Sequence, residues 1–533
     1  MRLFPQKTPR THHFFALRHC PRSTDEDMDF GLGDDYADER SDYTAQRPDY
    51  GVGSFQCTQQ GVELVKATGK WLIESGTIDP GSKIQWEIIA DDSDRDIDSA
   101  KALWDGILEG LNELRDRSFV SQHDHKVRID SRFSRPGDQC NADDIVSNHA
   151  YHAEIKSRLL TAPRPDMSFG DALDLLQSVA GQGNVGDLRS YIPHGEPEYD
   201  EDEETIVGAP YFLNRMGADM FLSRIAGADP IFAPGTSQAD VFKLYQFHSW
   251  YRSITDVDNS WDAGYGAAQV RAMLMTLRDG YYMKKPAEDT YDTRVTIIFG
   301  HDGDLDTMAT ALGARWVLKP PFISGPGGEF LETPPTSGIH AKRNLDTDRV
   351  DLSFVYPLYS TDPNAETFQV DFSGTLEYTP FLFIRGIPDY FKTTDKSVFL
   401  EGSKSLELLE EHTMKSLSNF IETTCLQATE DYWKTHREVS GNETVTDEYY
   451  TTGSASRSFT SPLALALETI FGIVVLALLW HFFCRRDKKY DSLDVKIQKK
   501  AKEFESRKEL NEEGSTTFIG EEEAELDKLP SVV

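Results

Sequence analysis

Residues 294–314 read RVTIIFGHDGDLDTMATALGA, and this stretch decides the class of fold. Four of its first seven residues are β-branched, which favours a buried strand, and the rest has the pattern of a turn and a helix. Similar units occur near the amino terminus. Residues 12–17 (HHFFAL) and 86–90 (WEIIA) predict strands, and after the second one apolar residues recur at helical spacing, at Ile97, Ala100, Leu103, Ile107 and Leu111.

A helical middle separates these units. Its clearest helical patterns are DALDLLQSVAG and AAQVRAMLMTLRDGYYM, both between about residues 112 and 290. Strands and helices that alternate on both sides of a helical segment indicate an α/β fold. We therefore predict a central, mostly parallel sheet flanked by helices, with an inserted, mainly helical domain over about 112–290.

The composition limits the function. The chain has 533 residues, and 89 Asp and Glu against 55 Lys and Arg give a formal net charge of −34. Such a charge excludes a general nucleic-acid-binding protein. The hydrophobic fraction of 39% is too high for a disordered chain, so we expect most of it to be globular.

Residues 462–484 (PLALALETIFGIVVLALLWHFFC) predict one transmembrane helix, because the stretch is long and apolar enough to cross a bilayer. The basic residues that follow, from Arg485 to Lys489, mark its cytoplasmic side. We expect a single-pass type I membrane protein whose large amino-terminal part is lumenal or extracellular. Residues 437–461 then form a stalk with a glycosylation sequon at Asn442, and 485–533 a cytoplasmic tail. A buried core helix is the alternative for 462–484.

Other features concern processing and partners. The first residues contain no apolar stretch of signal-peptide length, so we expect an incomplete or misassigned amino terminus. Cys484 lies at the membrane face and is a candidate for palmitoylation, and the ending Ser531-Val532-Val533 weakly fits a PDZ-type partner. The cysteines before the span can form one or two disulfides, whose pairing the sequence leaves open: Cys20, Cys57, Cys140 and Cys425.

Charged side chains follow three of the predicted strands: Arg18, His19, Arg22, Arg95, His301 and Asp302. Ligands bind outside the carboxyl ends of strands in open α/β sheets, so these side chains are expected to meet there. They would form a cationic pocket in a very acidic protein. Guanidinium groups bind phosphate oxygens in pairs, and a neutral imidazole can attack phosphorus. No metal-binding motif is found in the sequence, and we expect neither a metal nor a cofactor.

The blocks around these residues resemble the histidine acid phosphatases, a family that includes phytases. The family's opening motif, RHGxRxP, is matched at Arg18, His19 and Arg22. Four further blocks follow in the family's order over about 14–335. They are CTQQG (57–61) with TGKWL (68–72), IIADDSDRDIDSAKALWDGI (88–107), GHD (300–302) with ALG (311–313), and GPGGEFLE (325–332).

The resemblance implies a histidine phosphatase fold over 12–436 and an acid phosphatase of the membrane-bound type. His19 would attack phosphorus and form a phosphohistidine, and Asp302 would protonate the leaving alcohol as general acid. The phosphate would be held by Arg18, Arg22, Arg95 and His301. The implied partner is a small phosphomonoester substrate. A mildly acidic optimum is expected, because a carboxyl next to a bound phosphate keeps its proton.

Three positions depart from the family: Cys20 replaces Gly, Thr24 replaces Pro and Asp96 replaces Thr. We expect Cys20 to pack within the loop and Asp96 to weaken phosphate binding by Arg95. The main alternative is a catalytically inactive type I membrane receptor or adhesion protein that retains the fold. An intracellular inositol-phosphate enzyme is a third possibility, in which 462–484 is a core helix.

The segment 25–49 bears on substrate preference. It carries ten carboxylates against Arg40 and Arg47, which would repel a substrate with many phosphates. We therefore expect small monophosphates to be preferred over phytate, unless the segment points away from the entrance.

Overall fold

The structure is a computed structural model of the whole chain. It describes residues 10–24, 50–114, 127–129, 148–179, 188–201, 205–225, 236–280, 291–325, 330–358 and 373–421. The chain divides into two compact units, Met1–Tyr450 and Thr451–Val533, and all described residues lie in the first. The predicted stalk, Asn442, the predicted span, the tail and the carboxyl-terminal motif therefore lie outside the described residues. So do Cys140, Cys425, Cys484 and the acidic segment 25–49.

The described strands of the core form one nine-stranded sheet. Across the sheet they are β12 (Lys392–Thr393), β13 (Val398–Leu400), β9 (Arg349–Pro357), β8 (Gly338–Asn344), β1 (Thr11–Arg18), β6 (Thr293–Gly300), β2 (Ile84–Ala90) and β3 (Val127–Ile129), with β10 (Leu376–Pro380) paired to β9. The pairs β1–β6, β6–β2 and β2–β3 are parallel, as predicted for the centre of the sheet. The remaining pairs are antiparallel, which the sequence patterns did not indicate: β1–β8, β8–β9, β9–β13, β13–β12 and β9–β10.

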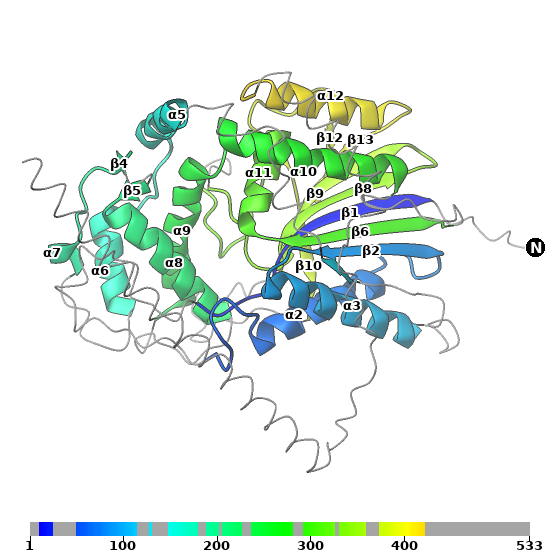
Figure 1. Ribbon diagram of the computed structural model, residues 1–533, viewed down its shortest axis with the longest axis horizontal. Helices are drawn as coiled ribbons and strands as arrows, with labels where there is room; N and C mark the ends of the chain where they lie inside the picture. The colour runs from blue at the N-terminus through cyan, green and yellow to red at the C-terminus, as the bar shows by residue number, and fades with distance from the viewer. Residues whose placement is uncertain are drawn as a thin grey trace, which may run out of the picture. The chain divides into compact units, whose positions relative to one another are not determined.

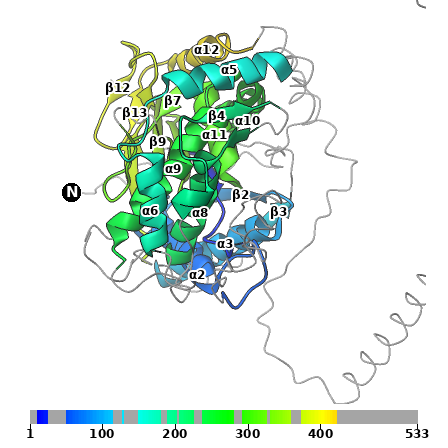
Figure 2. The same cartoon turned by 90° about the vertical axis from the view of Figure 1, so that its left-hand side faces the viewer.

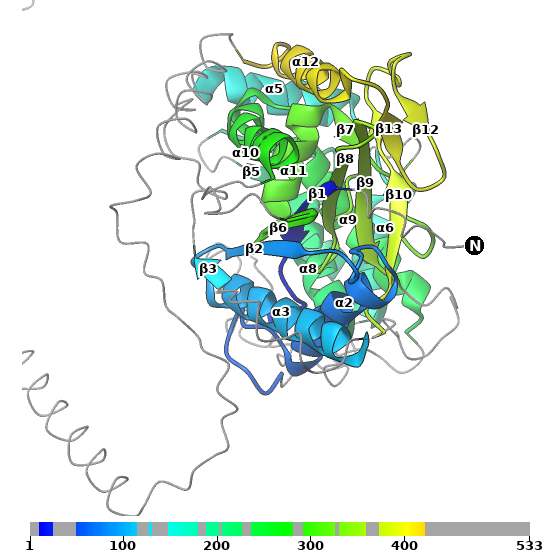
Figure 3. The ribbon, with the colours of Figure 1, turned by 90° about the vertical axis from the view of Figure 1, so that its right-hand side faces the viewer.

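Helices cover both faces of this sheet (Figures 1 and 3). On one face lie α2 (Gln59–Glu74) and α3 (Asp94–Leu114), and on the other lie α10 (Ser260–Asp279), α11 (Asp302–Leu312) and α12 (Ser405–Leu417). Alternate residues of β1 supply the two cores. Phe14 and Ala16 belong to one hydrophobic cluster and Phe15 and Leu17 to the other, as the two-residue period of a strand requires.

The predicted helical insertion contains α5 (Asn148–Thr161), α6 (Phe169–Val179), α7 (Leu188–Tyr191), α8 (Ala209–Ile225) and α9 (Gln238–Thr255), with a hairpin of β4 (Glu198–Asp200) and β5 (Thr205–Val207). Figure 2 views the molecule from the side on which these helices gather. The last helix of the predicted range, α10, packs instead against β1, β8 and α11 of the sheet layers. A short pair, β7 (Ala314–Arg315) with β11 (Leu382–Phe383), follows α11.

Among the described residues, no helix is both long enough and apolar enough to cross a bilayer.

Candidate active site

The ends of three parallel strands bring the predicted residues together. Arg18 is the last residue of β1 and pairs in register with Gly300, the last residue of β6. Leu17 of β1 and Ala90 of β2 both pair with Phe299, so all three strands end at the same level. His19 continues β1 by donating its backbone N–H to Gly300 O at 3.0 Å. His301 and Asp302 begin α11, and Arg95 lies in the first turn of α3.

His19 is buried, and its ring is held in one tautomer. Its Nδ1 lies 2.8 Å from the carbonyl oxygen of Cys20. A carbonyl oxygen can only accept, so Nδ1 carries the proton and Nε2 of the neutral ring keeps a free lone pair. Burial, reinforced by the charges of Arg18 and Arg95, holds the pKa of His19 well below its usual value. The low pKa favours the neutral form of the imidazole.

The arginines around His19 crowd one another. Burial and the neighbouring charge of Arg18 lower the pKa of Arg22 to about 10, against its usual 12.5. The guanidinium of Arg22 lies over the Phe55 ring at 4.7 Å and donates to Ser23 O at 2.9 Å. Within the described residues, the buried Nε atoms of Arg18 and Arg95 have no hydrogen-bond partner. Crowded cations with unused donors favour the binding of an anion.

His301 lies edge-on to His19, with ring centroids 5.5 Å apart. Its backbone N–H donates to Asp304 Oδ2 at 2.7 Å, which fixes it at the start of α11. Arg95 donates to His301 Nε2, so the proton of the neutral ring lies on Nδ1, which faces Asp91 Oδ2 at 3.6 Å. Burial, followed by the charge of Arg95, lowers the pKa of His301 to about 4. This arrangement holds Arg95 and His301 together at the carboxyl ends of the strands.

Asp96, which we expected to place a negative charge beside Arg95, is fully buried. Its Oδ2 lies 3.6 Å from His301 Nε2 and accepts a hydrogen bond from Ser93 Oγ. Burial raises the pKa of Asp96 to about 7. At acidic pH the group is therefore mostly protonated and neutral.

Asp91, Asp96 and His301 are the one group within the described residues whose ligand atoms lie close enough to hold a metal ion, within 4.8 Å of one another. Arg95 occupies His301 Nε2 with a hydrogen bond. Its positive charge beside this group disfavours a cation there.

Asp302 lies between two arginines. Its Oδ2 is 3.0 Å from Arg18 Nη2 and 3.2 Å from Arg252 Nη1. Burial alone would raise the pKa of Asp302, but the charges of Arg18 and Arg252 outweigh it and hold the pKa well below its usual value. The carboxyl is thus ionised in the free protein, whereas a general acid must carry a proton.

Arg252 is a site residue that the sequence motifs did not reveal. It lies in α9, in the helical insertion, and is almost completely buried. Besides Asp302 it binds Thr333 Oγ1 at 2.7 Å and pairs with Asp306. Arg18 also donates to the carbonyl of Thr333, so both arginines contact one loop residue. An arginine within a helical stretch rich in aromatic residues is the sequence signal that could have identified it.

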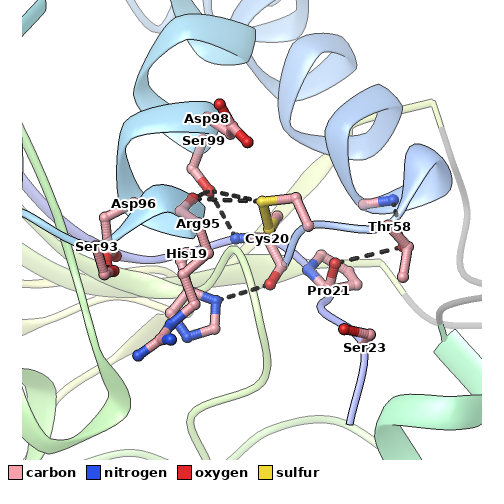
Figure 4. The surroundings of a disulfide bond; sticks show 12 residues. His19, Cys20, Pro21, Ser23, Thr58, Ser93, Arg95, Asp96, Asp98 and Ser99 are labelled. Atoms are coloured by element: carbon pink, nitrogen blue, oxygen red, sulfur yellow. Dashed lines mark hydrogen bonds between the residues drawn. A yellow bond between two sulfur atoms is a disulfide. The ribbon is translucent and has the colours of Figure 1, made fainter. Parts of the chain in front are cut away.

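We expected Cys20 to pack within the loop, but it also makes a covalent bond. It forms a disulfide with Cys57, with Cα atoms 5.7 Å apart. Figure 4 shows its surroundings, with the Cys20 carbonyl toward the His19 ring. Thr24, which departs from the family's Pro, is buried, and its hydroxyl contacts Tyr50 Oη at 3.4 Å.

Comparison with known proteins identifies the fold. No protein-family model and no curated protein sequence matches the chain. A solved structure of the Klebsiella sp. ASR1 phytase is similar, with a TM-score of 0.53 and 13% identity, over 79% of this chain and 98% of that one. The Hafnia alvei phytase in complex with tartrate gives a TM-score of 0.51 and 14% identity, over 79% and 99%.

These similarities show that the chain has the fold of these phytases. The resemblance to histidine acid phosphatases that the sequence blocks indicated is thereby confirmed at the level of the fold.

Proposed function

We propose that the chain is an acid phosphatase that hydrolyses phosphomonoesters through a phosphohistidine on His19. The observation that carries the proposal is the state of that ring, which is neutral, protonated on Nδ1 and surrounded by arginines. Such a ring presents the Nε2 lone pair to an anion that the arginines attract. The fold shared with phytases supports the same reaction class.

In the proposed first step, His19 Nε2 attacks phosphorus and the bond from phosphorus to the ester oxygen breaks. Arg18, Arg22 and Arg95 stabilise the charge on the phosphoryl oxygens. Asp302 gives its proton to the leaving oxygen. Water then attacks the phosphohistidine, its proton passes to Asp302, and the bond from phosphorus to nitrogen breaks to restore the neutral ring.

The ion pairs of Asp302 explain why this cycle requires an acidic medium. The free carboxyl is ionised because Arg18 and Arg252 hold its pKa low. A bound phosphate adds negative charge and draws on Arg18, and both effects raise the pKa of Asp302. Substrate and proton are therefore expected to bind together, which favours turnover at mildly acidic pH.

Small phosphomonoesters are the proposed substrates. The phytases with similar structures act, by name, on phytate. In this chain the ten carboxylates of segment 25–49 argue against a highly phosphorylated ligand. A comparison of kcat/KM for phytate and for a simple monophosphate separates the two substrate classes, and a clear preference for phytate would contradict the electrostatic argument.

We also propose that the protein is anchored by 462–484 with the phosphatase unit lumenal or extracellular, on the sequence pattern alone. An oxidising compartment of that kind suits the Cys20–Cys57 disulfide.

The test uses the purified full chain and an aryl phosphate at about pH 5. His19→Ala should abolish turnover, and brief reaction of the native protein with labelled substrate should trap an acid-labile phosphohistidine. The matched control is His194→Ala, which replaces a histidine in the loop between α7 and β4 and should keep full activity. A native protein without activity would support the receptor alternative, and an active His19→Ala variant would remove His19 as nucleophile.

A further inference from the structure

The disulfide Cys20–Cys57 joins the residue next to the proposed nucleophile to the start of α2. Three contacts fix Cys20. Its backbone N–H donates to Ser99 Oγ at 2.9 Å, its carbonyl accepts from His19 Nδ1 at 2.8 Å, and its side chain is bonded to Cys57. Cys20, whose carbonyl sets the tautomer of His19, is thus also held at its backbone N–H by Ser99 and at its side chain by a covalent bond (Figure 4).

The other end of the disulfide is equally well fixed. Cys57 directly precedes Thr58, whose side chain caps α2 by accepting from the Gly61 N–H. Cys57 Sγ also lies 3.3 Å from the carbonyl oxygen of Arg95, to which Ser99 Oγ donates at 2.6 Å. Both half-cystines are buried. The bond therefore ties the loop after β1 to the first turns of α2 and α3.

We propose that the Cys20–Cys57 disulfide is a positioning bond for the nucleophile, so that its reduction by a dithiol slows phosphoryl transfer. The proposal rests on the phosphatase function proposed above. The bond holds the Cys20 carbonyl against His19 Nδ1 and thereby keeps Nε2 directed at phosphorus. On reduction the S–S bond breaks, two thiols form and the dithiol is oxidised to its own disulfide.

Phosphate affinity should depend little on this bond, because the arginines are fixed by other contacts. Arg18 belongs to β1 and pairs with Asp302, and Arg95 belongs to α3 and binds His301. The loop around Arg22 keeps its backbone hydrogen bonds, Ser23 N–H to Gln56 O and Thr58 N–H to Pro21 O. Loss of the disulfide should therefore appear in kcat and not in the competitive inhibition constant of inorganic phosphate.

The experiment compares the native full chain with the double variant Cys20→Ala/Cys57→Ala, each before and after treatment with a dithiol. Both are assayed well below their melting temperatures, so that a loss of stability is measured separately. In the double variant kcat should fall by about tenfold to 100-fold. The inhibition constant of inorganic phosphate should stay within about twofold. Dithiol treatment should bring the native chain to the level of the variant and should change the variant no further, which excludes effects of the other cysteines.

A readout without turnover comes from the nitrogen chemical shifts of histidine, assigned to His19 by comparison with His19→Ala. The native ring should show the Nδ1–H tautomer, and the double variant should show a mixture. A double variant with native kcat overturns the positioning role, while the proposed function stands if the native chain is active. If the native chain is inactive, the proposed function fails. The positioning role is then tested by the nitrogen shifts alone, and equal His19 shifts in the native chain and the double variant overturn that role.

Discussion

Asp302 shows how a residue's role depends on what is bound. Its carboxyl lies 3.0 Å from Arg18 Nη2, and the two neighbouring arginines hold its pKa low in the free protein. In the proposed mechanism, a bound phosphate takes over Arg18 and leaves the carboxyl next to an anion. We expect this change to convert the side chain from ionised to protonated, as a general acid must be.

Asp302→Asn should therefore slow the hydrolysis of alkyl phosphates by about 100-fold or more and that of aryl phosphates far less, because aryl leaving groups need little protonation. Steady-state rates on a matched pair of substrates test this. Asp306→Asn is the control, since Asp306 also pairs with Arg252. It should affect both substrates equally, and a similar loss on both for Asp302→Asn would remove Asp302 from the acid role.

Asp96 provides a test of pH dependence. Burial raises its pKa to about 7, so the native state keeps a proton that the unfolded chain loses near pH 4. As the pH rises from about 4 to 7 the native protein should therefore lose stability through this group. Above that range a negative charge should appear 3.6 Å from His301 Nε2, beside Arg95, and weaken phosphate binding.

Asp96→Asn mimics the protonated form and should have near-native kcat/KM at about pH 5. It should lose less activity than the native protein above about pH 7, and its free energy of unfolding should fall less as the pH rises from about 4 to 7. Profiles of activity and urea unfolding against pH measure both effects. Asp98→Asn, a half-exposed carboxylate further along α3, is the control and should follow the native profiles. Profiles of Asp96→Asn that coincide with the native ones would refute the shifted pKa.

At the scale of elements, the close contact of α2 and α3 places Arg95. A Cβ atom on Gly69 would lie 2.1 Å from Leu103 O, and one on Gly106 would lie 1.8 Å from Lys66 O. Only glycine allows the two backbones to approach in this way. The first turn of α3 therefore lies beside the start of α2, where Arg95 and Ser99 meet the disulfide.

Gly106→Ala should push the two helices apart and lower the free energy of unfolding by about 1–3 kcal/mol. Denaturant unfolding measures the change. The control is Gly303→Ala in α11, where no heavy atom lies within 4 Å of the added Cβ. That substitution should be neutral or should stabilise by up to about 1 kcal/mol through helix propensity. A Gly106→Ala variant with native stability would contradict the close packing.

At the scale of the whole molecule, the site needs the insertion as well as the sheet. Arg252 and its partners on α11 join α9 to the carboxyl ends of the strands, and Tyr50 Oη contacts Ser223 Oγ of α8 at 2.7 Å. All these residues lie in the first compact unit, whereas the predicted span at 462–484 lies in the second.

Truncation before Pro462 should therefore give a protein that stays in solution without detergent and keeps kcat within about twofold of the full chain. Activity assays and size-exclusion chromatography in the presence and absence of detergent check this. Truncation before Ser405 is the control, because it removes α12, which packs against α11 and β9, and should unfold the protein. Aggregation of the protein truncated before Pro462 would favour a core helix at 462–484.

The sequence by itself determined the parallel centre of the sheet and the identity of the residues at its edge. Arg18, Arg95 and His301 follow strands whose hydrophobic patterns are local, and the carboxyl ends of parallel neighbours must meet at one edge. The fold could therefore be assigned from short blocks of sequence, even though the similar phytases share only 13% and 14% of its residues.

Only the tertiary structure decided the pairing of Cys20 with Cys57, the place of Arg252 beside Asp302 and the antiparallel half of the sheet. The disulfide, the contact of Arg252 with Asp302 and the β1–β8 pairing that joins the antiparallel half to β1 all link segments far apart in the chain, which no local pattern encodes. The charge states of His19, Asp96 and Asp302 were also decided only by the tertiary structure. Burial and neighbouring charges set the pKa of each group, and these surroundings exist only when the chain is folded.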